Sequence, residues 1–110
     1  MSINQTLKSA LTPIAPAEAD VYEGSEAVYI TFEYSSLPDD FGDDEPSHER
    51  FLVSVHLYAP NGINTLDRRR AIKKALCDAG ATWPEYENAS DKNGQHHIFD
   101  CEIVTAIGGE

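Results

Sequence analysis

Hydrophobic and polar residues alternate along two stretches of the chain, residues 28–34 and 50–59. This period of two is typical of β-strands that bury one face. In the first strand Val28, Ile30, Phe32 and Tyr34 form the alternating set expected to be buried. In the second, Phe51, Val53, Val55 and Leu57 lie on one face, and Leu52, Ser54, His56 and Tyr58 lie on the other. These two stretches are expected to be the main strand and a second long strand.

Three further strands are expected, of which residues 82–88 form the weaker one. Val21 and Tyr22 predict a brief strand that forms a hairpin with residues 28–34, after a linker over residues 15–19. Residues 82–88 predict a strand that Pro84 restricts to a sheet edge or a bend, with Trp83 packed in the core or at the edge. An Asn93-Gly94 turn then leads into a last strand over residues 95–107. One face of that strand carries His97, Phe99, Cys101, Ile103 and Thr105.

Two segments have helical spacing instead. Ser2 is expected to cap a helix of about ten residues that ends before Pro13. Asn64 or Thr65 is expected to cap a second helix that runs to Ala79, with Gly80 as its stop. Its predicted apolar positions are Leu66, Ile72, Ala75, Leu76 and Ala79, which leave Arg68, Arg69, Lys73 and Lys74 mostly outward. The chain therefore predicts a single α+β domain over residues 1–110, with a mostly antiparallel sheet of about four to five strands covered by two helices.

Charge is distributed unevenly along the chain. The formal net charge is −11; eleven acidic residues and no Lys or Arg lie in residues 9–49, whereas five of the eight basic residues lie in residues 68–74. A protein that binds a nucleic-acid backbone needs clustered positive charge, so no direct nucleic-acid contact is expected. We expect charge-complementary protein contacts instead. A run of basic residues on a helix is usually a solvated face, but here we expect it to meet the acidic loop of a neighbouring copy, with Arg68, Arg69 and Lys73 as candidate partner-binding residues.

The loop after the first central strand concentrates acidic residues around Phe41 and Gly42. It is expected to face solvent or a partner, and its candidate partner-binding residues are Asp39, Asp40, Phe41, Asp43, Asp44 and Glu45. The spacing does not fit a calcium-binding EF-hand, because the acids come as adjacent pairs and the twelfth position from Asp39 is Arg50. No metal or cofactor is expected.

Other chemistry is not favoured by the pattern. Cys77 and Cys101 share no metal-binding or redox spacing and are expected to be free thiols. His96 and His97 are neighbours on one strand and so point to opposite faces, one half-buried and one exposed. No nucleophile elbow, His-Glu-x-x-His motif or phosphate-binding glycine loop occurs, so an enzyme is not expected. Neither a secretory signal nor a membrane span is expected, and the protein is expected to be made and used in a cytoplasm.

The chain resembles the tail-terminator, or tail-completion, proteins of long-tailed bacteriophages and prophages. The similarity runs over nearly the whole length, through short segments in the family's order: Leu7-Lys8-Ser9-Ala10-Leu11, Val21-Tyr22-Glu23-Gly24, Tyr29-Ile30-Thr31-Phe32 with Tyr34 and Pro38, Phe41-Gly42-Asp43-Asp44-Glu45, and Val53-Ser54-Val55. The resemblance implies a non-enzymatic structural protein of the virion tail, present in the host cytoplasm during assembly. It implies a homo-oligomeric ring, commonly a hexamer, that caps the tail tube, stops its polymerisation and presents a surface for head joining. The implied partners are copies of itself, the tail tube protein and the head-tail connector protein.

Two other functions remain open from the sequence. A small acidic inhibitor that mimics DNA would carry carboxylates spread over a surface at phosphate-like spacing. An enzyme with a carboxylate-bound metal is the third possibility. Concentration of the acids in one loop and its flanks favours the tail-terminator interpretation over the DNA mimic.

Overall fold

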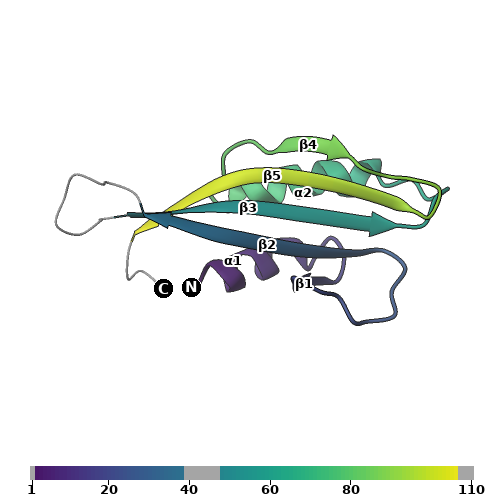
Figure 1. Ribbon diagram of the computed structural model, residues 1–110, viewed down its shortest axis with the longest axis horizontal. Coiled ribbons are helices and arrows are strands. Elements are labelled where there is room, and N and C mark those ends of the chain that lie inside the picture. Colours follow the sequence, from purple (N-terminus) through teal and green to yellow (C-terminus); the bar gives the residue numbers. More distant parts are fainter. Residues whose placement is uncertain (1, 39–47, 107–110) are drawn as a thin grey trace.

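The computed structural model describes residues 2–38 and 48–106 and has two helices on one side of a five-stranded sheet (Figure 1). The elements are α1 (Ile3–Leu11), β1 (Ala17–Ala19), β2 (Tyr29–Pro38), β3 (His48–Ala59), α2 (Leu66–Asp78), β4 (Glu85–Asn88) and β5 (Gln95–Ala106). The strand order is β1-β2-β3-β5-β4. All pairs are antiparallel except β1 with β2. The predicted α+β class and the mostly antiparallel sheet are confirmed.

Helix α1 forms where the sequence predicts it. Ser2 and Gln5 make a capping box, with the Gln5 N–H donating to Ser2 Oγ at 3.2 Å and the Ser2 N–H donating to Gln5 Oε1 at 3.2 Å. Such reciprocal bonds satisfy two of the amide groups that the first helical turn leaves unpaired. The buried side of α1 consists of Ile3, Leu7 and Leu11, which repeat every four residues and pack on the sheet.

Helix α2 covers the other half of the same sheet face. Ile72 and Leu76 are fully buried, whereas Leu66, predicted to be apolar core, is 39% exposed. The helix begins after Asn64, whose side chain accepts a hydrogen bond from the Leu66 N–H, and it ends before Gly80, which has a φ of +99°. A glycine at this position adopts the left-handed conformation without a Cβ clash and so stops the helix.

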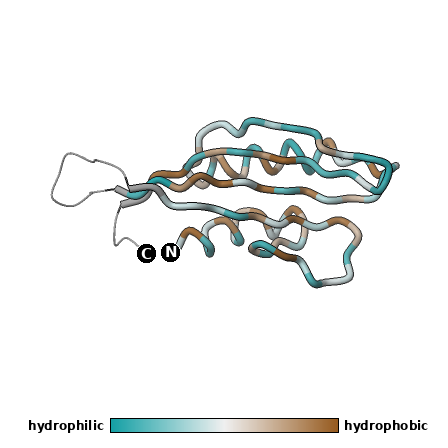
Figure 2. Tube along the Cα trace, viewed as in Figure 1, coloured by the Kyte–Doolittle hydropathy of each residue, from teal (hydrophilic) through white to brown (hydrophobic). Residues whose placement is uncertain are grey.

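The hydrophobic core lies between these helices and the inward positions of the long strands. Ile30 and Phe32 of β2, Val55 and Leu57 of β3, and Phe99 of β5 are completely buried. Hydrophobic residues recur along these strands and along the helices (Figure 2). The buried face predicted for the first strand is confirmed at Ile30 and Phe32, whereas Tyr34 is 37% exposed. The predicted shared face of Phe51, Val53, Val55 and Leu57 is confirmed and is the buried one, and the Thr105 side chain of the last strand lies outside the described residues.

The first edge of the sheet differs from the prediction. The expected strand at Val21 and Tyr22 is wrong: the chain pairs earlier, through β1, and runs parallel to β2. Asp20, at φ 64°, then turns the chain away, and Val21 is 65% exposed. Asp is among the few non-glycine residues that adopt this left-handed conformation readily. At the other edge, Pro84 is buried as the chain enters β4, whereas Trp83 is 68% exposed, so the predicted core or edge packing of Trp83 is also wrong.

Candidate interaction surface

No described helix covers the second face of the sheet, which we call the uncovered face. The registers of β2, β4 and β5 place five carboxylates on it: Glu33 of β2, Asp100 and Glu102 of β5, and Glu85 and Glu87 of β4. Arg50 of β3 is also on this face, where it forms an ion pair with Glu102 at 3.4 Å. The uncovered face is therefore acidic within the described strands.

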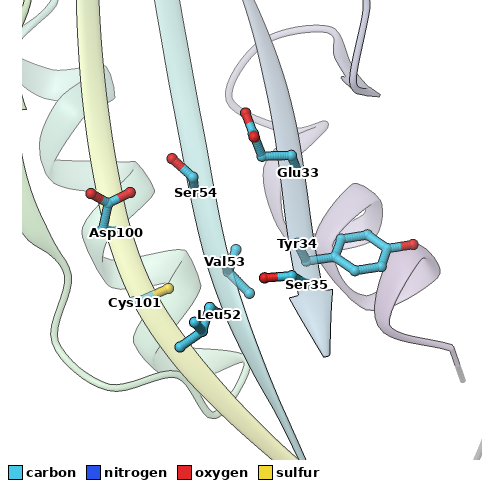
Figure 3. Close-up of a pocket in the computed structure, with 8 residues that line it drawn as sticks. All are labelled: Glu33, Tyr34, Ser35, Leu52, Val53, Ser54, Asp100 and Cys101. Carbon is cyan, nitrogen blue, oxygen red and sulfur yellow. The ribbon is translucent and has the colours of Figure 1, made fainter. Parts of the chain in front are cut away.

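A shallow hollow of about 240 Å³ lies across β2, β3 and β5. Figure 3 shows Glu33, Ser54 and Asp100 on these three neighbouring strands, with the Tyr34 ring pointing away toward α1. Cross-strand pairing puts Glu33 beside Ser54 and Ser54 beside Asp100. Leu52 and Ser35 also line the hollow. The hollow thus has a carboxylate on either side and a hydroxyl between them.

A row of stacked rings continues from this hollow along the uncovered face. Ring centroids are 4.6 Å apart for Tyr22 and Tyr29, 5.0 Å for Tyr29 and Tyr58, and 4.5 Å for Tyr58 and His96. Such distances are typical of aromatic pairs with favourable contact. The row joins the chain segment after β1 to strands β2, β3 and β5.

Two histidines and a carboxylate are hydrogen-bonded at the end of this row. His56 Nδ1 lies 2.8 Å from His96 Nε2, and His56 Nε2 lies 3.0 Å from Glu33 Oε1. Burial lowers the pKa of His96, and the neighbouring His56 lowers it further. A bond between two imidazoles needs a neutral acceptor nitrogen, so protonation of both rings would break it. The arrangement favours one neutral and at most one charged histidine.

A second polar network lies under the N-terminal end of α2, on the covered face. Tyr86 Oη is 2.7 Å from His97 Nδ1, and His97 Nε2 is 2.8 Å from Gln95 Oε1. The Gln95 amide nitrogen donates to the Pro60 and Ile63 carbonyls, so Gln95 Oε1 is the acceptor and His97 Nε2 carries the hydrogen. Neutral His97 therefore accepts from the Tyr86 hydroxyl. Burial lowers the pKa of His97, and Arg69 lowers it further.

The sequence predicted that the basic side chains of α2 point mostly outward, but not all of them do. Arg69 donates from Nε to Thr65 Oγ1 at 3.1 Å and from Nη1 to Tyr86 Oη at 3.4 Å. Lys73 Nζ lies 5.2 Å from the centroid of the Tyr86 ring. The prediction is wrong for these two residues, because Tyr86 on the edge strand draws them back against the sheet. Arg68 is half-buried, and its Nε has no hydrogen-bond partner among the described residues.

The remaining predicted site residues are Asp39, Asp40, Phe41, Asp43, Asp44 and Glu45, which lie outside the described residues. In the described parts of the chain, no group of three or more His, Cys, Asp or Glu side chains is arranged to hold a metal ion. Likewise, none of the described helices is long and apolar enough to cross a membrane. Cys77 and Cys101 are free thiols, as predicted.

The sequence identified the opposite orientations of His96 and His97, which are confirmed. It did not identify the contact between His56 and His96, and it predicted one half-buried and one exposed ring where His97 is 2% exposed. Alternation alone assigns His56 and His96 to the same face of the sheet. Their contact also requires the register that pairs Tyr58 with His96, which no local sequence signal gives.

Comparison with known proteins supports the fold and gives no information about activity. No protein-family model matches the chain, and no curated protein matches it in sequence. Eighteen chains of solved structures match it. One of them, which has only an identifier for a name, superposes with a TM-score of 0.59 over 94% of this chain and 86% of its own length, at 10% sequence identity. Similarity at this level of identity supports a shared fold alone.

Proposed function

We propose that this chain is a phage tail terminator that caps the tail tube as a ring, stops tube polymerisation and offers a surface for head joining. The proposal rests on the sequence resemblance and on one structural observation. That observation is the separation of charge onto opposite sides of the sheet. The uncovered face carries five carboxylates, whereas α2, on the other side, carries five basic and two acidic residues.

Charge separation of this kind suits ring assembly. A ring joins unlike surfaces of successive subunits, so each copy must present two different complementary surfaces. An acidic face and a basic helix on opposite sides of one subunit meet that requirement. The proposed ring, commonly of six copies in the family, would then contact the tail tube protein on one side and the head-tail connector protein on the other.

The test is deletion of this chain from the genome that encodes it, followed by electron microscopy of the particles. We expect tails of uncontrolled length that do not join filled heads. Complementation with the intact chain should restore both tail length and joining. Tails of normal length that join heads normally in a clean deletion would reject the proposed function.

One observation favours a DNA-mimicking inhibitor as the second candidate. The described carboxylates of the uncovered face are spread over strands β2, β5 and β4, whereas the prediction from the sequence emphasised their concentration in one loop and its flanks. Glu85 is the cross-strand neighbour of Asp100, so their backbones are about 4.8 Å apart. Inhibition of a DNA-binding enzyme by the pure protein, relieved by replacing these carboxylates with amides, would favour this candidate. No inhibition across a panel of nucleases and restriction enzymes would count against it.

A further inference from the structure

We propose that the uncovered face of one copy binds α2 of a second copy, with Arg70 of the second copy entering the hollow between Glu33 and Asp100. This inference rests on the proposed ring assembly and names the surfaces that would form its subunit contact. It follows from three features of the described residues: the sheet edges, the hollow and the set of basic side chains on α2.

The sheet edges are poor surfaces for self-assembly. Edge strand β1 has three residues, and edge strand β4 has four. Short edges that carry charge, as β4 does with Glu85 and Glu87, discourage strand-to-strand pairing between molecules. The faces are therefore the better candidates. Strands β2, β3 and β5, of 10, 12 and 12 residues, present on the order of 500 Å² of projected face. A standard interface buries about 800 Å² per partner, so the contact would need most of the uncovered face.

The hollow has the chemistry of a guanidinium site. Glu33 and Asp100 are separated by one intervening strand, so their backbones lie about 10 Å apart. That separation leaves room for a planar cation between two carboxylates, with the Ser54 hydroxyl as a further acceptor. Leu52, which is 40% exposed, offers an apolar surface for the aliphatic part of an arginine. Within the described residues Asp100 makes no ion pair, and Glu33 bonds only His56.

Arg70 is the cation on α2 best placed to enter such a site. Arg69 and Lys73 are engaged with Tyr86, Lys74 pairs with Asp78 at 2.8 Å, and Arg68 is half-buried. Arg70 is exposed and has no ion pair within the described chain. It is therefore available to a second molecule without breaking a contact within its own. Arginine also fits paired carboxylates better than lysine does, because its guanidinium donates two parallel hydrogen bonds.

The experiment is sedimentation equilibrium of the purified full chain up to millimolar concentration, at low salt. Arg70→Glu should weaken self-association at least tenfold, and Asp100→Arg should do the same. The double variant, Arg70→Glu with Asp100→Arg, should recover most of the association because it reverses the pair. Lys92→Glu is the matched control: it makes the same change of charge at an exposed lysine in the turn between β4 and β5, and it should associate like the unmodified chain.

Several outcomes would overturn the inference. The first is a chain that stays monomeric at millimolar concentration. The second is equal weakening of self-association by Arg70→Glu and Lys92→Glu. The third is no recovery of association in the double variant, provided that circular dichroism shows each single variant to be folded. Loss of tail binding in Asp100→Arg with normal self-association would show that the hollow binds a basic partner other than a second copy. Tail length in the deletion is a separate readout. If the double variant recovers self-association but the deletion still gives tails of normal length, the contact between copies stands and the proposed function is rejected.

Discussion

The hydroxyl of Tyr86 is expected to contribute more to stability than its exposure suggests. Tyr86 is 38% exposed, yet its hydroxyl is bonded to Nδ1 of His97, which is 2% exposed. Replacing Tyr86 with Phe removes this donor and leaves the ring in place above the histidine. Because the ring still blocks access, water does not readily replace the lost bond. A buried acceptor in the covered face is then left without a partner.

The expected loss depends on whether the remaining partner of the bond stays buried, as the His97 acceptor does here. A typical intramolecular hydrogen bond contributes about 0.5–1.5 kcal/mol to the free energy of unfolding, and leaving a buried partner unsatisfied costs about 1–3 kcal/mol. We therefore expect Tyr86→Phe to lower the free energy of unfolding by about 1–3 kcal/mol. For a domain of this size each kcal/mol corresponds to a fall in Tm of roughly 4–8 °C.

Tyr34→Phe is the matched control. Tyr34 is 37% exposed, and its hydroxyl donates to Asn4 Oδ1 at 3.2 Å. Asn4 is only half-buried, so water can replace the hydroxyl and the loss should stay within about 0.5 kcal/mol. Urea denaturation monitored by circular dichroism would measure both variants. Equal losses in the two variants, or a loss below about 0.5 kcal/mol in Tyr86→Phe, would refute the reasoning.

Three further predictions concern pH, the acidic loop and the thiols. Folding lowers the pKa of His97 below its ordinary value of about 6.5, so the unfolded chain binds more protons than the folded chain as the pH falls. The free energy of unfolding should therefore be highest above that pH and decline as the pH falls toward the pKa of the folded state. Urea midpoints measured from pH 8 to 5 would show this decline, which should be smaller in His97→Gln. Replacing the acids of the loop with Asn should change Tm little, because exposed charges contribute less than about 1 kcal/mol each. Calcium should not raise Tm either. A rise of several degrees at micromolar calcium would show an ion site instead. These acids are Asp39, Asp40, Asp43 and Asp44. Burial raises the pKa of the Cys101 thiol to about 11. Iodoacetamide at pH 8 should therefore alkylate half-buried Cys77 first in the native protein. Faster labelling of Cys101, measured by peptide mapping, would contradict its burial.

Much of this fold could be predicted from the sequence because its long elements are regular. Strand β3 alternates strictly between buried and less buried residues over residues 51–59, and α1 places Leu7 and Leu11 at helical spacing after a capping residue. In each case the local pattern and the tertiary packing demand the same structure. The pattern therefore located β2, β3, β5 and both helices to within a few residues.

The sequence failed where a neighbour in space decided the outcome. Strand β1 is Ala-Glu-Ala, with no residue type that favours strands; it forms because β2 offers free backbone groups, as in the bond from the Ile30 N–H to the Pro16 carbonyl at 2.7 Å. Arg69 turns inward because Tyr86 lies opposite it in the folded chain. The hollow depends on the register of three strands, which is why no sequence motif predicted it.

The uncovered face also carries apolar groups that a purely solvated face would not need. Leu52 and Val104 are 40% and 49% exposed there, on the opposite side of the hollow from the stacked rings of Tyr29 and Tyr58. Interfaces of stable complexes combine an apolar or aromatic centre with a polar rim, and the charged groups mainly set the orientation and rate of encounter. The carboxylates of this face would then select a basic partner, while the leucine, valine and tyrosine side chains would provide most of the contact energy. Salt, which shortens the Debye length from about 10 Å at 0.1 M to about 3 Å at 1 M, should for that reason weaken such a contact without abolishing it.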